Sequence, residues 1–436
     1  MSDSKTIAFF PEPGAWGPTN NCVAIAEVLS DRGHRVVFVV DASFEGILEA
    51  KGFEERVMRM APPDEDADPT ADPWAEFIRV TAPEFRKPTI EQQETVTKPI
   101  WEALVAGAKY SHERIMEIWD DVRPDVVCTD NVTGYPAVEL AGCPWARFVS
   151  ANPLEMRDAD LPPPLSGLPV ADRSGWQAFV DEYRRVHEAL LAEHNDFRTS
   201  VGVAPCPPDE FNTHSPWLNM YLFPEVADYD RAQPLDTTWH RLQSTVRVSD
   251  APFDVQAHVP ASGTRDGKVI YLSLGSLGCM DLTLMQRLID ALATTEHRTI
   301  VSMGPLKDQM TLHDGQYGDE FLPQPSILPQ CDLLITHGGN NTTCEGFHFG
   351  LPMIGLPLFW DQYDNAQRLQ ETGFGRRLPT YDWTEEQLVG AVNELLADER
   401  LASSMRTHAE AIRNDPGREK AATLLERLAV TGEPVT

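Results

Sequence analysis

Short apolar runs alternate with amphipathic stretches through the first half of the chain. Residues 5–10 and 35–40 are apolar and rich in β-branched or aromatic side chains, which predicts two strands. The stretch 20–31 between them has helical periodicity and is followed by a polar Arg-Gly-His turn, so we expect a helix there. Further strands are predicted at 124–128 and 146–149. Strands that alternate with helices favour a parallel sheet with helices on both faces.

The second half of the chain shows the same alternation after a segment that lacks it. Residues 244–266 have no periodicity, which predicts a linker between two domains. Beyond this linker we expect a helical tail at 384–430, a helix at 282–295, and strands at 268–272, 299–301, 333–336 and 353–356. Two doubly wound α/β domains joined in this way leave a deep cleft between the carboxyl ends of their sheets, where ligands of such folds bind.

Two stretches of the first half interrupt this alternation. Residues 58–122 are first rich in prolines and acids and then helical, and residues 152–215 contain three consecutive prolines and a helix near 176–198. Insertions of this kind in an α/β domain often carry binding specificity. The alternative is that they only cover the sheet.

The chain carries 67 acidic and 36 basic side chains, and so a formal charge of −31. A strongly acidic protein gains no affinity from neutralising phosphates and is repelled by anionic lipids, so we expect no nucleic-acid partner. No apolar run approaches the roughly 18 residues that a membrane span needs. The seven cysteines are scattered without a CxxC pair, and the first residues resemble no secretory signal. These features predict a cytoplasmic protein without a disulfide framework or zinc site.

The segment 321–365 holds the densest set of polar residues placed after strand ends. His337 and two glycines follow the predicted strand 333–336. Glycines let the backbone approach a ligand closely, and the helix that begins near Asn340 presents unpaired N–H groups and a positive dipole end, which suit a diphosphate. Glu345 lies two helical turns further on, where a carboxylate can accept hydrogen bonds from vicinal sugar hydroxyls. This pattern indicates a nucleotide-sugar site.

One strand later, Trp360-Asp361-Gln362 again follows a strand end, and a carboxylate beside an amide is a typical pair for reading hexose hydroxyls. The whole segment matches PQxxILxxxDxxxTHGGxNxxxE and, after it, GxPxxxxPxxxDQxxNA, with the spacing intact. It resembles the nucleotide-sugar signature of the family-one UDP-glycosyltransferases, which include plant secondary-metabolite and bacterial macrolide glycosyltransferases. Weaker landmarks of this family are RGHRVVFV, TDNVTGYPAVELAGCPWARF and YLSLGS.

The resemblance implies the GT-B fold, in which two doubly wound Rossmann-like α/β domains face each other across a cleft. It implies an acceptor-binding domain over 1–243, the linker over 244–266, a nucleotide-sugar-binding domain over 267–415, and a helix within 416–436 that packs back on the first domain. It also implies no cofactor and no metal, because side chains and a helix dipole neutralise the diphosphate of the UDP- or TDP-sugar. The sequence does not indicate the oligomeric state.

The resemblance assigns donor-binding roles residue by residue. Phe321 replaces the family's usual base-stacking Trp and keeps an aromatic face. Gln324 is expected to contact the base or ribose, Glu345 the ribose hydroxyls, and Asp361 and Gln362 the transferred sugar. The diphosphate is expected to lie against Ser276, His337, Gly339, Asn341 and Thr342. Ser276 and Thr342 have the alternative role of capping helices.

The pattern fails at the first loop, where the family carries a His that takes the acceptor's proton. Aligning Gly14 and Pro18 places Ala15 at that position, whereas the Asp that orients the His remains as Asp130. A positioned base typically contributes about 10²–10⁴-fold. Three replacements are open: Asp130 acts directly, the acceptor reacts with little help, or another His such as His214 reaches the site.

The resulting hypothesis is an inverting transfer of a hexose from a UDP- or TDP-sugar to a small, largely apolar acceptor. Aromatic residues on the acceptor side suggest the apolar acceptor: Trp16, which we assign to acceptor binding, and Trp74, Phe77 and Phe85. Two alternatives remain. The protein binds a nucleotide sugar without transferring it, as the loss of the His at Ala15 suggests, or it is an epimerase or hydrolase of its nucleotide sugar.

Overall fold

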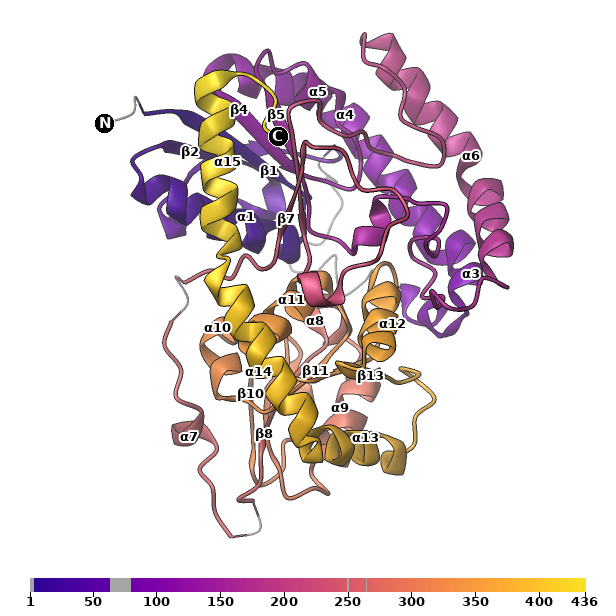
Figure 1. Ribbon diagram of the computed structural model, residues 1–436, viewed down its shortest axis with the longest axis vertical. Helices are drawn as coiled ribbons and strands as arrows, with labels where there is room; N and C mark the ends of the chain where they lie inside the picture. The colour runs from indigo at the N-terminus through magenta and orange to yellow at the C-terminus, as the bar shows by residue number, and fades with distance from the viewer. Residues whose placement is uncertain (1–3, 63–79, 249–250, 264) are drawn as a thin grey trace.

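The computed structural model describes all residues except 1–3, 63–79, 249–250 and 264, and it contains two sheets built from parallel strands (Figure 1). The first sheet has the order β3-β2-β1-β4-β5-β6-β7. Its strands are β1 (Thr6–Pro11), β2 (Arg35–Asp41), β3 (Glu54–Met58), β4 (Val126–Asp130), β5 (Trp145–Val149), β6 (Leu218–Leu222) and β7 (Trp239–Leu242). The expected pair of doubly wound α/β domains is confirmed.

The second sheet has the order β10-β9-β8-β11-β12-β13. Its strands are β8 (Val269–Ser273), β9 (Arg298–Ser302), β10 (Gln316–Asp319), β11 (Leu333–Thr336), β12 (Met353–Gly355) and β13 (Gly375–Arg377). The central strands β8 and β11 are buried along their whole length, as expected for strands covered on both faces. The edge strands β3, β10 and β13 are polar and only partly buried, which is why apolar periodicity did not predict them.

Helices cover both faces of each sheet (Figure 1). Those of the first half are α1 (Trp16–Asp31), α3 (Thr89–Gln92), α4 (Lys98–Val122), α5 (Pro136–Glu139) and α6 (Trp176–Ser200). Those of the second half are α7 (Val255–His258), α8 (Gly275–Gly278), α9 (Leu282–Leu292), α10 (Gln324–Ile327), α11 (Asn340–Phe349), α12 (Gln362–Thr372), α13 (Glu385–Ala397), α14 (Glu399–Asn414) and α15 (Gly417–Thr431).

The last helix, α15, returns to the first sheet and packs against α1 and β7 (yellow in Figure 1). Its apolar face is fully buried at Leu425 and Leu428. At its rim, Glu426 accepts hydrogen bonds from Arg32 at 2.6 Å and pairs with His34 at 2.9 Å. The chain therefore crosses between the two sheets twice, once through 244–266 and once before α15.

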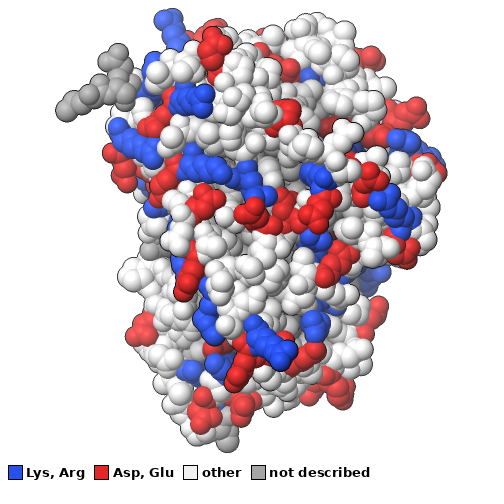
Figure 2. All heavy atoms as spheres, viewed as in Figure 1, with Lys and Arg blue, Asp and Glu red and all other residues white. Residues whose placement is uncertain are grey.

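Acidic and basic side chains are interspersed over the face shown in Figure 2, despite the large net negative charge. No helix within the described residues combines the length and apolarity that crossing a bilayer requires.

The return of α15 makes a stability prediction. Leu425→Ala removes a fully buried side chain and should lower the free energy of unfolding by about 2–5 kcal/mol. The matched control is Val430→Ala on the same helix, where the side chain is 61% exposed and the change should stay within about 0.5 kcal/mol. Chemical denaturation measures both. Equal stability of the two variants would contradict the observed packing of α15.

Candidate functional site

Buried polar groups join the two sheets at their carboxyl ends. The side-chain amide of Asn340, the first residue of α11, donates to the backbone oxygens of Ser150 and Leu222, both at 2.9 Å. The carboxylate of Asp364 accepts from the backbone N–H groups of Leu165 at 2.6 Å and Gly167 at 2.7 Å. The two domains therefore contact each other along an interface that includes Asn340 and Asp364 of the second domain and Ser150, Leu165, Gly167 and Leu222 of the first. We call this interface the seam.

His337 is wedged between two glycines at the start of this seam. A Cβ atom on Gly275 would lie 2.7 Å from the ring, and one on Gly339 would lie 2.5 Å from it. Gly275 also has a φ of 72°, which favours glycine. Burial lowers the pKa of His337 to about 4, so the ring is neutral at pH 7. Its Nδ1 has no hydrogen-bond partner among the described residues.

The other expected diphosphate contacts surround His337. Ser276 is exposed on α8, directly after Gly275. Asn341 and Thr342 form the first turn of α11 and are partly exposed. No side chain of the described residues caps this helix, so its first N–H groups are available to a ligand. The structure thus brings together the residues that the sequence assigned to the diphosphate.

Glu345 is almost fully buried and held by polar neighbours. Its carboxylate accepts hydrogen bonds from Gln324 and, at 3.2 Å, from Asn341. The guanidinium of Arg247 lies 3.6 Å from it, and both side chains are less than 10% exposed. Arg247 belongs to the linker, and the sequence analysis did not identify it. A nucleoside would therefore meet Glu345 as part of an ion pair.

Phe321 and Trp16 lie side by side, although the sequence analysis assigned Phe321 to the base of the donor and Trp16 to the acceptor. Phe321 is 70% exposed, as a base-stacking platform must be. The ring of Trp16, the first residue of α1, is 6.1 Å from that of Phe321 and 4.8 Å from that of Phe44. Trp16 therefore lies next to the expected base position.

Asp361 and Gln362, which are expected to contact the sugar, each use part of their side chain in hydrogen bonds within the protein. One carboxylate oxygen of Asp361 accepts from the backbone N–H of Asn152 at 2.9 Å, and burial raises the pKa of Asp361 to about 7. The amide oxygen of Gln362 accepts from the backbone of Leu358 at 3.0 Å and Phe359 at 3.3 Å. The amide nitrogen of Gln362 and the other carboxylate oxygen of Asp361 are therefore the atoms that could contact a sugar hydroxyl.

Asp130 ends β4 inside the seam. Burial raises its pKa to about 7, against the hydrogen bond from the backbone N–H of Ser150 at 3.2 Å. Its other oxygen, Oδ2, has no partner among the described residues. Beside it lies Glu12, which directly follows β1 and which the sequence analysis also missed. The buried carboxyl group of Asp130 and the partly buried one of Glu12 therefore lie at the same edge of the first sheet.

An aromatic cavity lies next to these groups and spans both domains. Trp101 of α4 stacks on Phe211 at 4.3 Å and approaches Trp360 at 5.2 Å. Trp360 has a φ of 59°, a left-handed conformation that costs a non-glycine residue about 1–3 kcal/mol and is typical of functional sites. The charged and polar residues of the lining are Arg147, Asn152, Glu155, Arg157, Asp209, Glu210, Asn212, Asp361 and Asp364.

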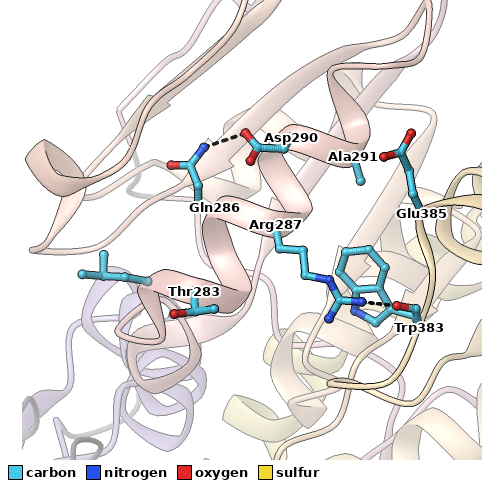
Figure 3. Close-up of a pocket in the computed structure, with 8 residues that line it drawn as sticks. Thr283, Gln286, Arg287, Asp290, Ala291, Trp383 and Glu385 are labelled. Carbon is cyan, nitrogen blue, oxygen red and sulfur yellow. Dashed lines mark hydrogen bonds between the residues drawn. The ribbon is translucent and has the colours of Figure 1, made fainter.

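The larger hollow of the surface lies elsewhere, between α9 and the start of α13 (Figure 3). There Arg287 lies 3.9 Å from the centre of the Trp383 ring and donates to the backbone oxygen of Tyr381 at 3.0 Å. The guanidinium of Arg287 is therefore occupied by contacts within the protein. None of the residues that the sequence analysis assigned to the site lines this hollow. It therefore does not compete with the seam as a candidate site.

Other acceptor-side expectations have varied positions. Phe85 is buried and stacks on Phe359 at 5.1 Å, so it joins the two domains. Trp74 and Phe77 lie outside the described residues.

His214 packs edge-on against Trp239 at 5.0 Å. Trp239 begins β7, so His214 lies at the amino end of the sheet, opposite Asp130. A proton transfer to His214 is therefore excluded by its position.

Comparisons with known proteins show the same fold. Residues 209–410 match the family model for UDP-glucoronosyl and UDP-glucosyl transferase. Oleandomycin glycosyltransferase of Streptomyces antibioticus is 25% identical over 94% of this chain and 88% of its own length. Among solved structures, the glycotransferase of kitacinnamycin has a TM-score of 0.70 at 20% identity, covering 97% of this chain and 99% of that one. The glycosyltransferase VinC in complex with DTDP has a TM-score of 0.66 at 17% identity, with the same coverage.

The wedge around His337 makes a prediction about ligand binding. Gly339→Ala places a methyl group against the ring and should displace His337, so affinity for UDP and TDP should fall by about 10-fold or more while the fold remains. Gly390→Ala on α13 is the matched control, because a Cβ there meets nothing within 4 Å. Isothermal titration calorimetry measures both variants. Unchanged affinity in Gly339→Ala would remove the ring from the nucleotide site.

Proposed function

The chain belongs to the family-one UDP-glycosyltransferases with the GT-B fold, and on this premise we propose that it transfers a hexose, with inversion, from a nucleoside diphosphate sugar to a small, largely apolar acceptor. The observation that carries the proposal is the uncapped start of α11 with His337 beside it, facing the first domain across the seam. A neutral imidazole donor and free helical N–H groups suit a diphosphate.

The donor is proposed to be UDP-glucose or a TDP-sugar. The Asp361-Gln362 pair is common among glucose users, which favours UDP-glucose. The structural relative VinC is described in complex with DTDP, which supports a thymidine donor. Phe321, which is exposed at the expected base position, can stack on either pyrimidine.

The acceptor is proposed to be a secondary metabolite. This agrees with the name of the relative oleandomycin glycosyltransferase and with the aromatic lining of the seam cavity by Trp101, Phe211 and Trp360. This cavity is about 50 Å³, so it would hold only one part of such an acceptor, and the neighbouring carboxylates are proposed to face the acceptor hydroxyl. The acceptor enters from the first domain and the donor from the second.

The experiment that tests this function is a panel of donors and acceptors analysed by mass spectrometry. UDP-glucose and TDP-glucose are incubated with oleandomycin, 4-methylumbelliferone and a library of hydroxylated aglycones. We expect at least one acceptor to gain the mass of a hexose. Tight nucleotide binding without product would favour a silent binding protein, the alternative suggested by Ala15. Consumption of the donor without any acceptor would instead indicate an epimerase or hydrolase.

The donor site makes a prediction at two residues. His337→Ala and Glu345→Ala each remove a polar contact to the nucleotide worth about 1.5–3 kcal/mol, so affinity for UDP or TDP should fall by about 10- to 100-fold. His313→Ala, which changes a partly exposed imidazole that bonds Asp290 at 2.8 Å, is the control for loss of a histidine. Calorimetry gives the affinities, and thermal denaturation checks the fold, because Glu345→Ala also leaves Arg247 without this carboxylate.

The acceptor side makes a separate prediction. Asp130→Asn keeps the shape of the side chain and the hydrogen bond from Ser150 but removes a carboxylate from the reaction centre. Turnover should fall by about 100-fold or more while nucleotide affinity stays unchanged, because Asp130 belongs to the other domain. If Asp130 only stabilises its loop, the variant should instead lose stability and keep its rate. Steady-state kinetics together with calorimetry separate the two results.

A further inference from the structure

Glu12 lies where the first strand of the chain enters the seam. The strand β1 ends at Pro11, and Pro11 is paired in register with Asp130 at the end of β4. The next residue, Glu12, therefore leaves the sheet at the same edge as Asp130 and three residues before Ala15. This places a second carboxyl group beside the position at which relatives of this chain carry their histidine.

The contacts of Glu12 hold its carboxylate in place and leave one oxygen unused. Its Oε2 accepts from the backbone N–H of Val132 at 2.8 Å, and Val132 lines the aromatic cavity of the seam. Its Oε1 is buried without a hydrogen-bond partner among the described residues, as is Oδ2 of Asp130. A buried carboxylate oxygen that lacks a donor costs free energy, which is characteristic of a site that a ligand completes.

The charges around Glu12 are mostly negative. Burial, followed by the charge of Asp130 and then of Glu155, raises the pKa of Glu12 to about 8, against the hydrogen bond from Val132. Arg147 of β5 forms an ion pair with Glu155, and its positive charge also lowers the pKa of Asp130. The charge of Glu12 also helps to raise the pKa of Tyr135, which lies just before α5. Burial therefore raises the pKa of both adjacent carboxyl groups, Glu12 and Asp130, toward neutral pH.

We propose that Glu12, with Asp130 beside it, accepts the proton of the acceptor hydroxyl in place of the histidine that is absent at Ala15. The proposal rests on the proposed glycosyl transfer and names the group that completes it. Two other nearby acids are less suited to accept this proton, because Glu155 is held by Arg147 and Asp361 is bonded to Asn152 on the donor side.

The step is balanced without any further reactant. The acceptor oxygen forms a bond to the anomeric carbon while the bond from that carbon to the diphosphate oxygen breaks. The electron pair leaves with the nucleoside diphosphate, and the hydroxyl proton passes to the carboxylate of Glu12. The neighbouring charge of Asp130 stabilises the protonated Glu12, because it raises the proton affinity of that carboxyl group. Ionised Glu12 is the active form, so turnover should rise with pH as Glu12 loses its proton.

The first test is Glu12→Gln, in which the amide oxygen can still accept from Val132 but cannot take a proton. Turnover of UDP-glucose or TDP-glucose with 4-methylumbelliferone and oleandomycin should fall by about 100-fold or more. Affinity for UDP and TDP should stay within about twofold of wild type, because Glu12 lies on the acceptor side. The control is Glu117→Gln on α4, whose exposed carboxylate pairs with Arg114.

The second test separates a proton acceptor from a structural acid. The rate of the wild type should rise with pH and be half-maximal near pH 8, and this rise should be absent in Glu12→Gln. In Asp130→Asn the rise should shift to lower pH, because the charge that raises the pKa of Glu12 is gone. The double variant should be no slower than the slower single variant, as for residues that act as one unit.

Infrared titration of the carboxyl groups tests the same claim without any turnover. The wild type should show several protonated carboxyl groups at neutral pH, because burial raises the pKa of Asp130 and Asp361 to about 7 as well, and Glu12→Gln should remove the one that titrates near 8. A folded Glu12→Gln variant with wild-type turnover and an unchanged pH profile would overturn the role of Glu12, as would a Glu12 that titrates like an exposed acid. Failure of the proposed function is a different result, because the wild type itself would then show no transfer to any acceptor in the panel.

Discussion

The burial of polar groups between the two domains is the constraint on which the site depends. Asn340 of α11 satisfies two backbone oxygens of the first domain, and Asp364 satisfies two of its backbone N–H groups. Each of these groups would cost about 1–3 kcal/mol if it were buried without its partner, so the four hydrogen bonds favour this arrangement of the two domains. This arrangement brings the start of α11 against the carboxyl ends of β5 and β6, and it thereby determines which residues face each other across the seam.

The same loss of water has opposite effects on the acids and on the imidazole of the seam. Burial raises the pKa of Asp130 and Asp361 to about 7 and that of Glu12 to about 8, and it lowers the pKa of His337 to about 4. Both shifts favour the neutral form. On the acceptor side the result is carboxyl groups whose proton affinity suits proton transfer near neutral pH, and on the donor side it is a neutral imidazole that can donate to a phosphate oxygen. The chemistry that we propose follows from where the water is excluded.

The sequence relates the residues of the proposed donor site to one another better than those of the proposed acceptor site, for a physical reason. His337, Asn341, Thr342 and Glu345 lie on one strand-to-helix turn, so their spacing along the chain already determines their arrangement in space. Glu12 and Arg247 reach the seam from segments distant in sequence, and no local spacing relates them to Asp130 or Glu345. Most strands that are buried on both faces were predicted, although the buried strand β6 was missed. The edge strands β3, β7, β10 and β13 were missed because their outer sides need no apolar residues.

The most direct test of this account is a crystal structure of the protein with UDP or TDP bound. The account predicts the diphosphate at the start of α11, within hydrogen-bond distance of the His337 ring and of the backbone N–H groups of Asn341 and Thr342. The pyrimidine should stack on Phe321, and the ribose hydroxyls should contact Glu345. A nucleotide bound anywhere else, such as in the hollow beside Arg287, with His337 and Glu345 free of it, would contradict the account.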